Sequence, residues 1–155
     1  MTNNDILRRL RYALNISDSA VIEILKLSGY EIDQSNLTAL FKKEDEQGCV
    51  VCSDKVMKLF LDGLIVYRRG RKEIKPGQEK KPDSPLTNNA ILKKLRIALE
   101  LKEDDMLGIL KLADADISKS ELNALFRKEG HRNYKECGEQ FLRNFLNGLT
   151  VRYRG

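Results

Sequence analysis

The strongest constraint on this chain is an internal repeat, because residues 2–70 return as residues 87–155 at a constant spacing of 85 positions. Direct comparison of the two copies finds 29 identical residues among 69 aligned pairs, with no insertion or deletion. Self-similarity of this kind indicates a duplicated structural unit. A unit of about 70 residues lies near the lower size limit for an independent hydrophobic core, so we expect the two copies to pack on each other.

Each copy shows the hydrophobic period of four short α-helices, with apolar residues recurring at intervals of three and four. Asn3 or Asn4 suits the N-cap of the first helix, Ser17 that of the second and Asp33 that of the third. The fourth helix is expected over residues 54–66. Strand-like alternation is absent. The predicted fold class is therefore all-α, with tandem four-helix units packed as an intramolecular pseudo-dimer.

One glycine lies inside the fourth predicted helix of each copy, at Gly63 and Gly148. Glycine in a helix interior costs about 1 kcal/mol relative to alanine. Its return at the same place in both copies predicts that another helix passes close by.

The repeat divides the chain into a first helical unit over residues 1–70, a connector over 71–86 and a second helical unit over 87–155. The connector contains all three prolines and a lysine-rich middle, which predicts an exposed, extended linker. At about 3.1 Å per residue, it could span roughly 50 Å. That length allows the second copy to pack against the first about a pseudo-twofold axis, as two subunits of a dimer do.

The composition favours a globular protein, since 41% of the residues are hydrophobic and 33% are charged. No apolar run approaches the roughly 18 residues of a membrane span. The polar N-terminal residues do not resemble a secretory signal. Three cysteines, an odd number, provide no disulfide framework and fit a reducing compartment. We therefore predict a cytoplasmic protein.

Several motifs carry a family resemblance. They are the Asn-Asn-x-Ile-Leu openings at Asn3 and Asn88, the Lys-Glu-Asp-Glu run over residues 43–46, and the Phe-Leu-x-Gly-Leu endings at Phe60 and Phe145, each preceded by a cysteine. With these motifs the chain resembles the YehS-like family, bacterial proteins of about this length made of a duplicated domain of unknown function. The resemblance implies two related helical domains in a bacterial cytoplasmic protein, and it brings no catalytic residues.

The cysteines raise the question of redox or metal chemistry. Cys49 and Cys52 have C-x-x-C spacing, but the second copy keeps only Cys137, so we expect buried apolar thiols in place of a redox pair. A Cys₃His zinc site would form if these three cysteines met His131 across the pseudo-twofold axis. Because His131 has no histidine counterpart in the first copy, we predict no metal site.

Catalytic patterns are also missing. The chain has a single histidine, no serine or cysteine placed as its partner by local sequence, and no glycine-rich phosphate loop. We therefore expect no enzymatic activity, no cofactor and no small-molecule substrate.

The net charge of +5 makes nucleic acid a candidate partner. Residues 1–70 carry ten basic and ten acidic side chains, the connector five and three, and residues 87–155 thirteen and ten, so no segment is densely basic. The second and third helices loosely resemble a helix-turn-helix, although the turn is about two residues too long.

Basic side chains that could contact phosphates occur in both copies and in the connector. They are Arg8, Arg9, Arg11, Arg68, Arg69, Arg71, Lys72, Lys93, Lys94, Arg96, Lys119, Arg152 and Arg154. An alternative explanation is that basic residues at helix C-termini complement the helix dipole.

A protein-interaction or adaptor module is the function we favour over nucleic-acid binding, since two small helical units can present a groove or an apolar seam. Candidate contact residues are those whose counterparts in the second copy are less apolar or changed in kind. They are Tyr30, Val50, Val51, Ile65 and Tyr67, together with the adjacent Val66, whose counterpart Val151 is identical. The same residues could instead form the interface between the copies.

Overall fold

The computed structural model describes residues 1–43, 45–70, 86–128 and 130–154, so most of the predicted connector, with Arg71 and Lys72, lies outside the described residues. All regular secondary structure in the described residues is helical. The helices are α1 Asn3–Leu14, α2 Asp18–Leu27, α3 Gln34–Phe41, α4 Asp54–Arg69, α5 Asn88–Ala98, α6 Glu103–Leu112, α7 Lys119–Leu125 and α8 Glu139–Arg154. The predicted all-α class is confirmed. None of these helices combines the length and the apolar character needed to cross a membrane.

The first helix is capped by Thr2, and the prediction of Asn3 or Asn4 as its N-cap is wrong. The Thr2 hydroxyl accepts from the Asp5 amide at 3.1 Å, and the Asp5 carboxylate accepts from the Thr2 amide at 3.2 Å. This reciprocal pair is a capping box. Both asparagine amides are used elsewhere, as described below.

The other predicted caps of the first copy are confirmed. Ser17 accepts from the Ala20 amide at 3.2 Å, and Asp33 accepts from the Asn36 amide at 2.8 Å. The fourth helix continues to Arg69, three residues beyond the predicted end at residue 66.

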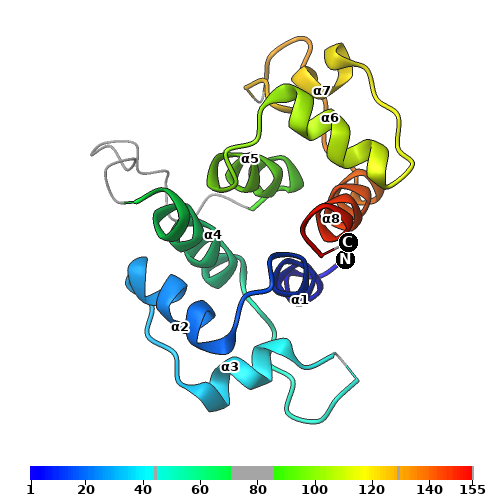
Figure 1. Cartoon of the computed structure of the whole chain (residues 1–155). Helices are drawn as coiled ribbons and strands as arrows, with labels where there is room; N and C mark the ends of the chain where they lie inside the picture. The colour runs from blue at the N-terminus through cyan, green and yellow to red at the C-terminus, as the bar shows by residue number, and fades with distance from the viewer. Residues whose placement is uncertain (44, 71–85, 129, 155) are drawn as a thin grey trace.

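The two copies exchange their first helices. Helix α1 packs mainly on α8, and α5 packs mainly on α4, so each first helix lies against the fourth helix of the other copy. Within each copy, α2 packs on α4 and α6 on α8. Figure 1 shows α2 and α3 on one side and α6 and α7 on the opposite side, with the other four helices between them. The predicted pseudo-dimer is therefore confirmed, and one continuous core includes buried residues of both copies.

The four central helices begin at the same end of the molecule. The Asn3 side chain, at the start of α1, donates to the Cys52 carbonyl, two residues before α4, at 3.1 Å. The Asn88 side chain, at the start of α5, donates in the same way to the Cys137 carbonyl, two residues before α8, at 3.2 Å. Helices α1 and α4 therefore start side by side, as do α5 and α8.

The same helices also end together. Arg154, the last residue of α8, donates to the Tyr12 carbonyl in the last turn of α1 at 3.2 Å. Arg69, the last residue of α4, donates to the Ile97 carbonyl in the last turn of α5 at 3.3 Å. The exchanged helices consequently run parallel, and all four carboxyl ends lie at one end of the molecule. Parallel helix dipoles place partial negative charge there, which arginines offset.

The two helix glycines lie where helices touch. A Cβ atom on Gly63 would be 2.0 Å from the Ile24 carbonyl oxygen, and one on Gly148 would be 2.0 Å from the Ile109 carbonyl oxygen. Glycine is therefore required for α4 to approach α2 and for α8 to approach α6. The predicted close passage of another helix is confirmed in both copies.

Candidate interaction surfaces

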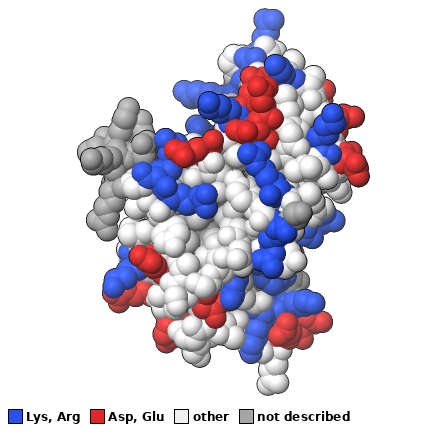
Figure 2. Space-filling view, viewed as in Figure 1, with Lys and Arg blue, Asp and Glu red and all other residues white. Residues whose placement is uncertain are grey.

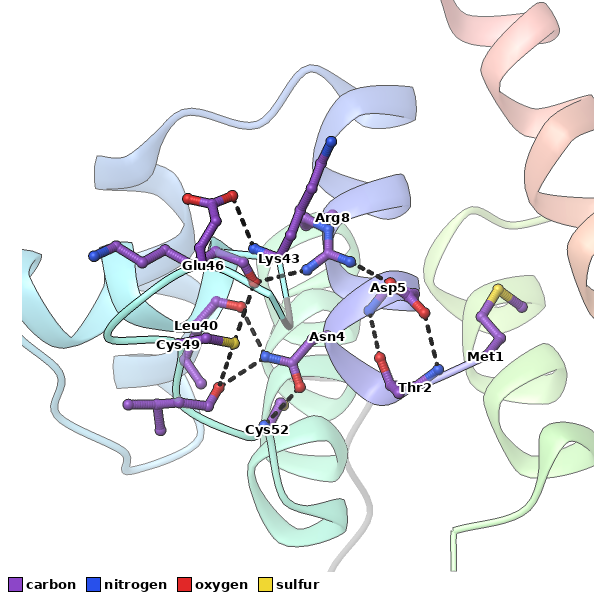
Figure 3. A network of polar contacts seen from close by, with 12 residues as sticks. Met1, Thr2, Asn4, Asp5, Arg8, Leu40, Lys43, Glu46, Cys49 and Cys52 are labelled. Atoms are coloured by element: carbon purple, nitrogen blue, oxygen red, sulfur yellow. Dashed lines mark hydrogen bonds and ion pairs between the residues drawn. The ribbon is translucent and has the colours of Figure 1, made fainter.

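A buried asparagine fixes the loop between α3 and α4, residues 42–53, which we call the first loop. The Asn4 side chain is 3% exposed. Its Nδ2 donates to the carbonyls of Leu40 at 2.9 Å and Val50 at 2.8 Å, and its Oδ1 accepts from the Cys52 amide at 2.8 Å. Figure 3 shows this side chain pointing from α1 toward the loop. Satisfied buried polar groups of this kind hold a backbone in one conformation.

The second copy repeats the arrangement in residues 126–138, the second loop. Asn89 donates to the carbonyls of Leu125 at 3.0 Å and Lys135 at 2.9 Å, and it accepts from the Cys137 amide at 2.8 Å. The repeated Asn-Asn pair therefore has a structural role that the sequence analysis missed. Its identical return in both copies was the available signal, but a distant backbone partner cannot be read from local sequence.

The two loops differ in the side chains that they present. Val50 and Val51 are 48% and 82% exposed, and the matching positions of the second loop hold the exposed Lys135 and Glu136. A surface hollow of about 460 Å³ lies beside Val51, with Met1 and Cys49 among its lining residues. The first loop thus presents two apolar side chains at its surface, next to a hollow.

The three cysteines are free thiols, and two of them are buried. Cys52 and Cys137 are each 3% exposed, and burial raises the pKa of both thiols to about 11, so both are protonated near neutral pH. The half-buried Cys49 donates to the Lys42 carbonyl at 3.4 Å. A buried protonated thiol is a poor nucleophile and a poor metal ligand.

The zinc arrangement considered from sequence does not form. Among the described residues, which include all three cysteines and His131, no group of three or more His, Cys, Asp or Glu side chains could hold a metal ion. His131 is exposed, and its Nδ1 accepts from the Asn133 amide within the same loop at 3.0 Å.

Three of the predicted phosphate-binding arginines make contacts inside their own copy. Arg8 donates to the Lys42 carbonyl at 2.9 Å and pairs with Asp5. Burial alone would raise the Asp5 pKa, but Thr2 hydrogen bonds and the Arg8 charge together hold it below its usual value. The other two are pseudo-equivalent, because Arg11 stacks on Phe41 and Arg96 on Phe126, each at 4.6 Å.

Four further predicted residues join the two copies. Arg9 donates to the Asn147 side chain at 2.9 Å, and Lys94 pairs with Asp62 at the pseudo-equivalent place. Arg69 and Arg154 bridge the helix ends described above. These four basic side chains serve the inter-copy interface, a role that spacing alone did not indicate.

The remaining predicted basic residues that the structure describes lie at the surface. Lys119 is 4.0 Å from Asp104, and Arg152 is 3.5 Å from Asp105. The pKa of Asp105 is lowered chiefly by a hydrogen bond from the Lys102 amide, with a contribution from Arg152. Arg68 and Lys93 are exposed. Figure 2 shows a run of Lys and Arg down the right of centre of the face that it draws, over the region of α8 and α1, with Asp and Glu mainly at its upper end and beside it.

The predicted contact residues divide into exposed and covered ones. Val50, Val51 and Tyr67 are exposed, Tyr30 and Ile65 are half-buried, and Val66 is 6% exposed.

The connection between α2 and α3 covers residues 28–33, which is longer than the 3–4-residue turn of a helix-turn-helix.

Exposed tyrosines and arginines gather where α1 and α8 end. Tyr12, Val151 and Tyr153 are 57%, 45% and 38% exposed. The Arg154 guanidinium lies 4.1 Å from the centre of the Tyr12 ring, and it also donates to the Asn15 side chain at 3.1 Å. We call Tyr12, Val151, Arg152, Tyr153 and Arg154 the tyrosine–arginine surface.

Comparisons with known proteins agree with the duplicated architecture. A family model described as "Protein of unknown function (DUF1456)" matches residues 3–70 and again residues 88–155. The chain is 43% identical over 152 residues to the uncharacterized protein YehS of Escherichia coli (strain K12), covering 98% of this chain and 96% of that protein. No solved structure matches the chain.

Proposed function

We propose that this chain, which belongs to the DUF1456 family of proteins of unknown function, is a non-enzymatic protein-interaction module of the bacterial cytoplasm. In this proposal, a partner protein binds the first loop by covering Val50 and Val51 and placing an apolar side chain in the adjacent hollow. Three free cysteines, two of them buried as protonated thiols, support a reducing compartment and a non-catalytic role.

The observation that carries the proposal is the difference between the two loops. Both are held by the same three asparagine hydrogen bonds, yet only the first exposes two β-branched apolar side chains. Because the second loop adopts the same anchored arrangement with Lys135 and Glu136, the fold does not require valine at these positions. Exposed apolar side chains without a folding role favour a binding role.

Anchoring also suits the first loop to recognition. A loop already fixed by buried hydrogen bonds loses little conformational freedom when a partner binds. Covering a fully exposed valine contributes about 1.5 kcal/mol or more, which corresponds to roughly a tenfold change in affinity.

The test combines site-specific crosslinking with an exchange of loop residues. A photo-crosslinking amino acid at Val51 is expected to capture one protein in cells, and the same amino acid at Glu136 serves as the matched control. With the captured protein purified, the double change Val50→Lys and Val51→Glu should weaken its binding about tenfold or more. The second loop already carries these residues, so folding should be preserved and is checked by circular dichroism. Equal capture at both positions, or unchanged affinity of the double variant, would refute the proposal.

Nucleic-acid binding is the alternative, supported by exposed arginines beside tyrosines where α1 and α8 end. Aromatic and arginine side chains can stack on unpaired bases. Binding through six phosphate contacts should weaken about 10³-fold between 50 and 200 mM salt. Fluorescence anisotropy with a labelled single-stranded RNA and a labelled DNA duplex at both salt concentrations tests this alternative. Binding that is undetectable at 50 mM salt, or unchanged by salt, would reject it.

A further inference from the structure

The tyrosine–arginine surface is separate from the first loop. The first loop lies near the starts of α1 and α4, whereas Tyr12 and Arg154 belong to the last turns of α1 and α8. The central helices run parallel, so the two surfaces lie toward opposite ends of the molecule. A ligand of one surface therefore leaves the other accessible.

Three features of this surface are typical of a binding site. Tyr12, Val151 and Tyr153 account for three of the eight large apolar side chains exposed among the described residues. Val151 precedes Arg154 by three residues, which places both on one face of α8, and the Arg154 guanidinium lies over the Tyr12 ring. Tyrosine and arginine are the residue types most enriched at the energetic centres of protein interfaces.

The Arg154 guanidinium is held in place before any ligand binds. It stacks on Tyr12, and its Nη1 donates to both the Tyr12 carbonyl and the Asn15 side chain. Among the described residues, no hydrogen bond uses its Nε or Nη2. The Nε and Nη2 donors, which no described residue occupies, match a carboxylate in a bidentate geometry. The neighbouring Arg152 is paired with Asp105 at 3.5 Å, so the carboxylate is expected on Arg154.

The pseudo-equivalent position in the other copy shares only some of these features. There Ile97 replaces Tyr12, and Val66, the counterpart of Val151, is 6% exposed against 45%. Arg69 makes the bond to the Ile97 carbonyl that Arg154 makes to the Tyr12 carbonyl. The arginine bond between helix ends is thus common to both copies, and the other end also exposes Ile97 and Tyr67, at 36% and 46%. What distinguishes this end is the stacking of Arg154 on the Tyr12 ring and the exposure of Val151.

We infer that the tyrosine–arginine surface is a second docking site, which binds an acidic protein segment with a carboxylate on Arg154 and an apolar side chain against Tyr12 and Val151. Charge complementarity identifies the partner chemistry. The site is independent of the first loop, and together the two surfaces would make the protein an adaptor between two partners.

The experiment titrates the ¹⁵N-labelled full-length protein with a synthetic peptide of alternating Glu and Leu residues, followed by amide chemical shifts. A peptide with Gln in place of every Glu is the matched control. We expect shift changes confined to the last turns of α1 and α8, saturating at millimolar peptide, with at least about tenfold weaker binding of the Gln peptide. No shifts, scattered shifts or equal binding of both peptides would overturn the inference.

Variants sharpen the same test. Arg154→Met keeps much of the apolar stem and should weaken the acidic peptide about tenfold, whereas Arg69→Met at the pseudo-equivalent bridge should leave its binding unchanged. Tyr12→Ile introduces the residue that the second copy has at Ile97, so it should fold normally and weaken binding several-fold. Equal effects of the two arginine variants would overturn the inference.

Two competing occupants give different results. Displacement of the peptide by a dT oligonucleotide, with steep salt dependence, would identify a nucleic-acid site and overturn the inference. Concentration-dependent mass in sedimentation, lost in the Tyr12→Ile variant, would identify a second copy and overturn it too. The Val50→Lys, Val51→Glu variant should bind the peptide normally, so failure here and failure of the first-loop proposal can be told apart.

Discussion

The first and second loops are held by the same hydrogen bonds but present two different surfaces. Asn4 and Asn89 make the same three bonds, to a helix-end carbonyl, a loop carbonyl and a cysteine amide. The tips then diverge, with valines in the first loop and a lysine and a glutamate in the second. Positions where the copies agree report what the fold needs, and positions where they differ are available for function. Three predictions test that distinction.

The largest effect is expected at the helix glycines, where the copies agree. Gly63→Ala and Gly148→Ala should each destabilise the protein by roughly 3 kcal/mol or more, because the new Cβ would lie 2.0 Å from a backbone carbonyl oxygen. Chemical denaturation followed by circular dichroism measures the loss of unfolding free energy.

Gly108, in α6, is the matched control for these glycines, since a Cβ there meets nothing within 4 Å. Gly108→Ala should stabilise the protein by up to about 1 kcal/mol through helix propensity. A Gly63→Ala or Gly148→Ala variant as stable as the parent would show that the helix contact can shift, and the requirement for glycine would be wrong.

The next effect concerns the buried asparagines. Asn4→Ala and Asn89→Ala should each lower the free energy of unfolding by about 2–3 kcal/mol, because each leaves two carbonyls and one amide without their side-chain partner. The two losses should be similar. Hydrogen exchange at the Cys52 amide should accelerate in the first variant alone. The exposed Asn123→Ala should change stability by less than about 0.5 kcal/mol. A large difference between the two variants would contradict the equivalence of the loops.

The smallest effect is expected where the copies differ in charge. Lys94 pairs with the carboxylate of Asp62, whereas Arg9 donates to the neutral amide of Asn147. Lys94→Met should cost about 1 kcal/mol or less at low ionic strength, and the cost should shrink in 1 M salt because salt screens ion pairs. Arg9→Met should cost a similar amount with little salt dependence. The same salt dependence in both variants would remove the distinction between the two pairs.

Local sequence patterns were enough to predict the all-helical class, the duplication, most helix caps and the close passage of a helix at Gly63 and Gly148. These features depend on local helix propensity and on the hydrophobic period, both of which are set by residues close together in the sequence. The internal repeat shows each feature twice. The error at Asn3 and Asn4 has the same origin. Asparagine is a favourable N-cap residue on local grounds, but here its side chain bonds to the backbone of a loop that is distant in sequence.

The tertiary structure decided which helix packs on which. Both an independent and an exchanged pairing of α1 bury the same apolar face, so periodicity cannot choose between them. The exchange is seen in the packing of α1 on α8 and of α5 on α4. It is also seen in the cross-copy bonds of Arg9, Lys94, Arg69 and Arg154, which the sequence analysis named as possible phosphate contacts. A charged side chain takes its role from what lies opposite it in space. For this reason the exposed surfaces emerged only once the helix ends were placed together.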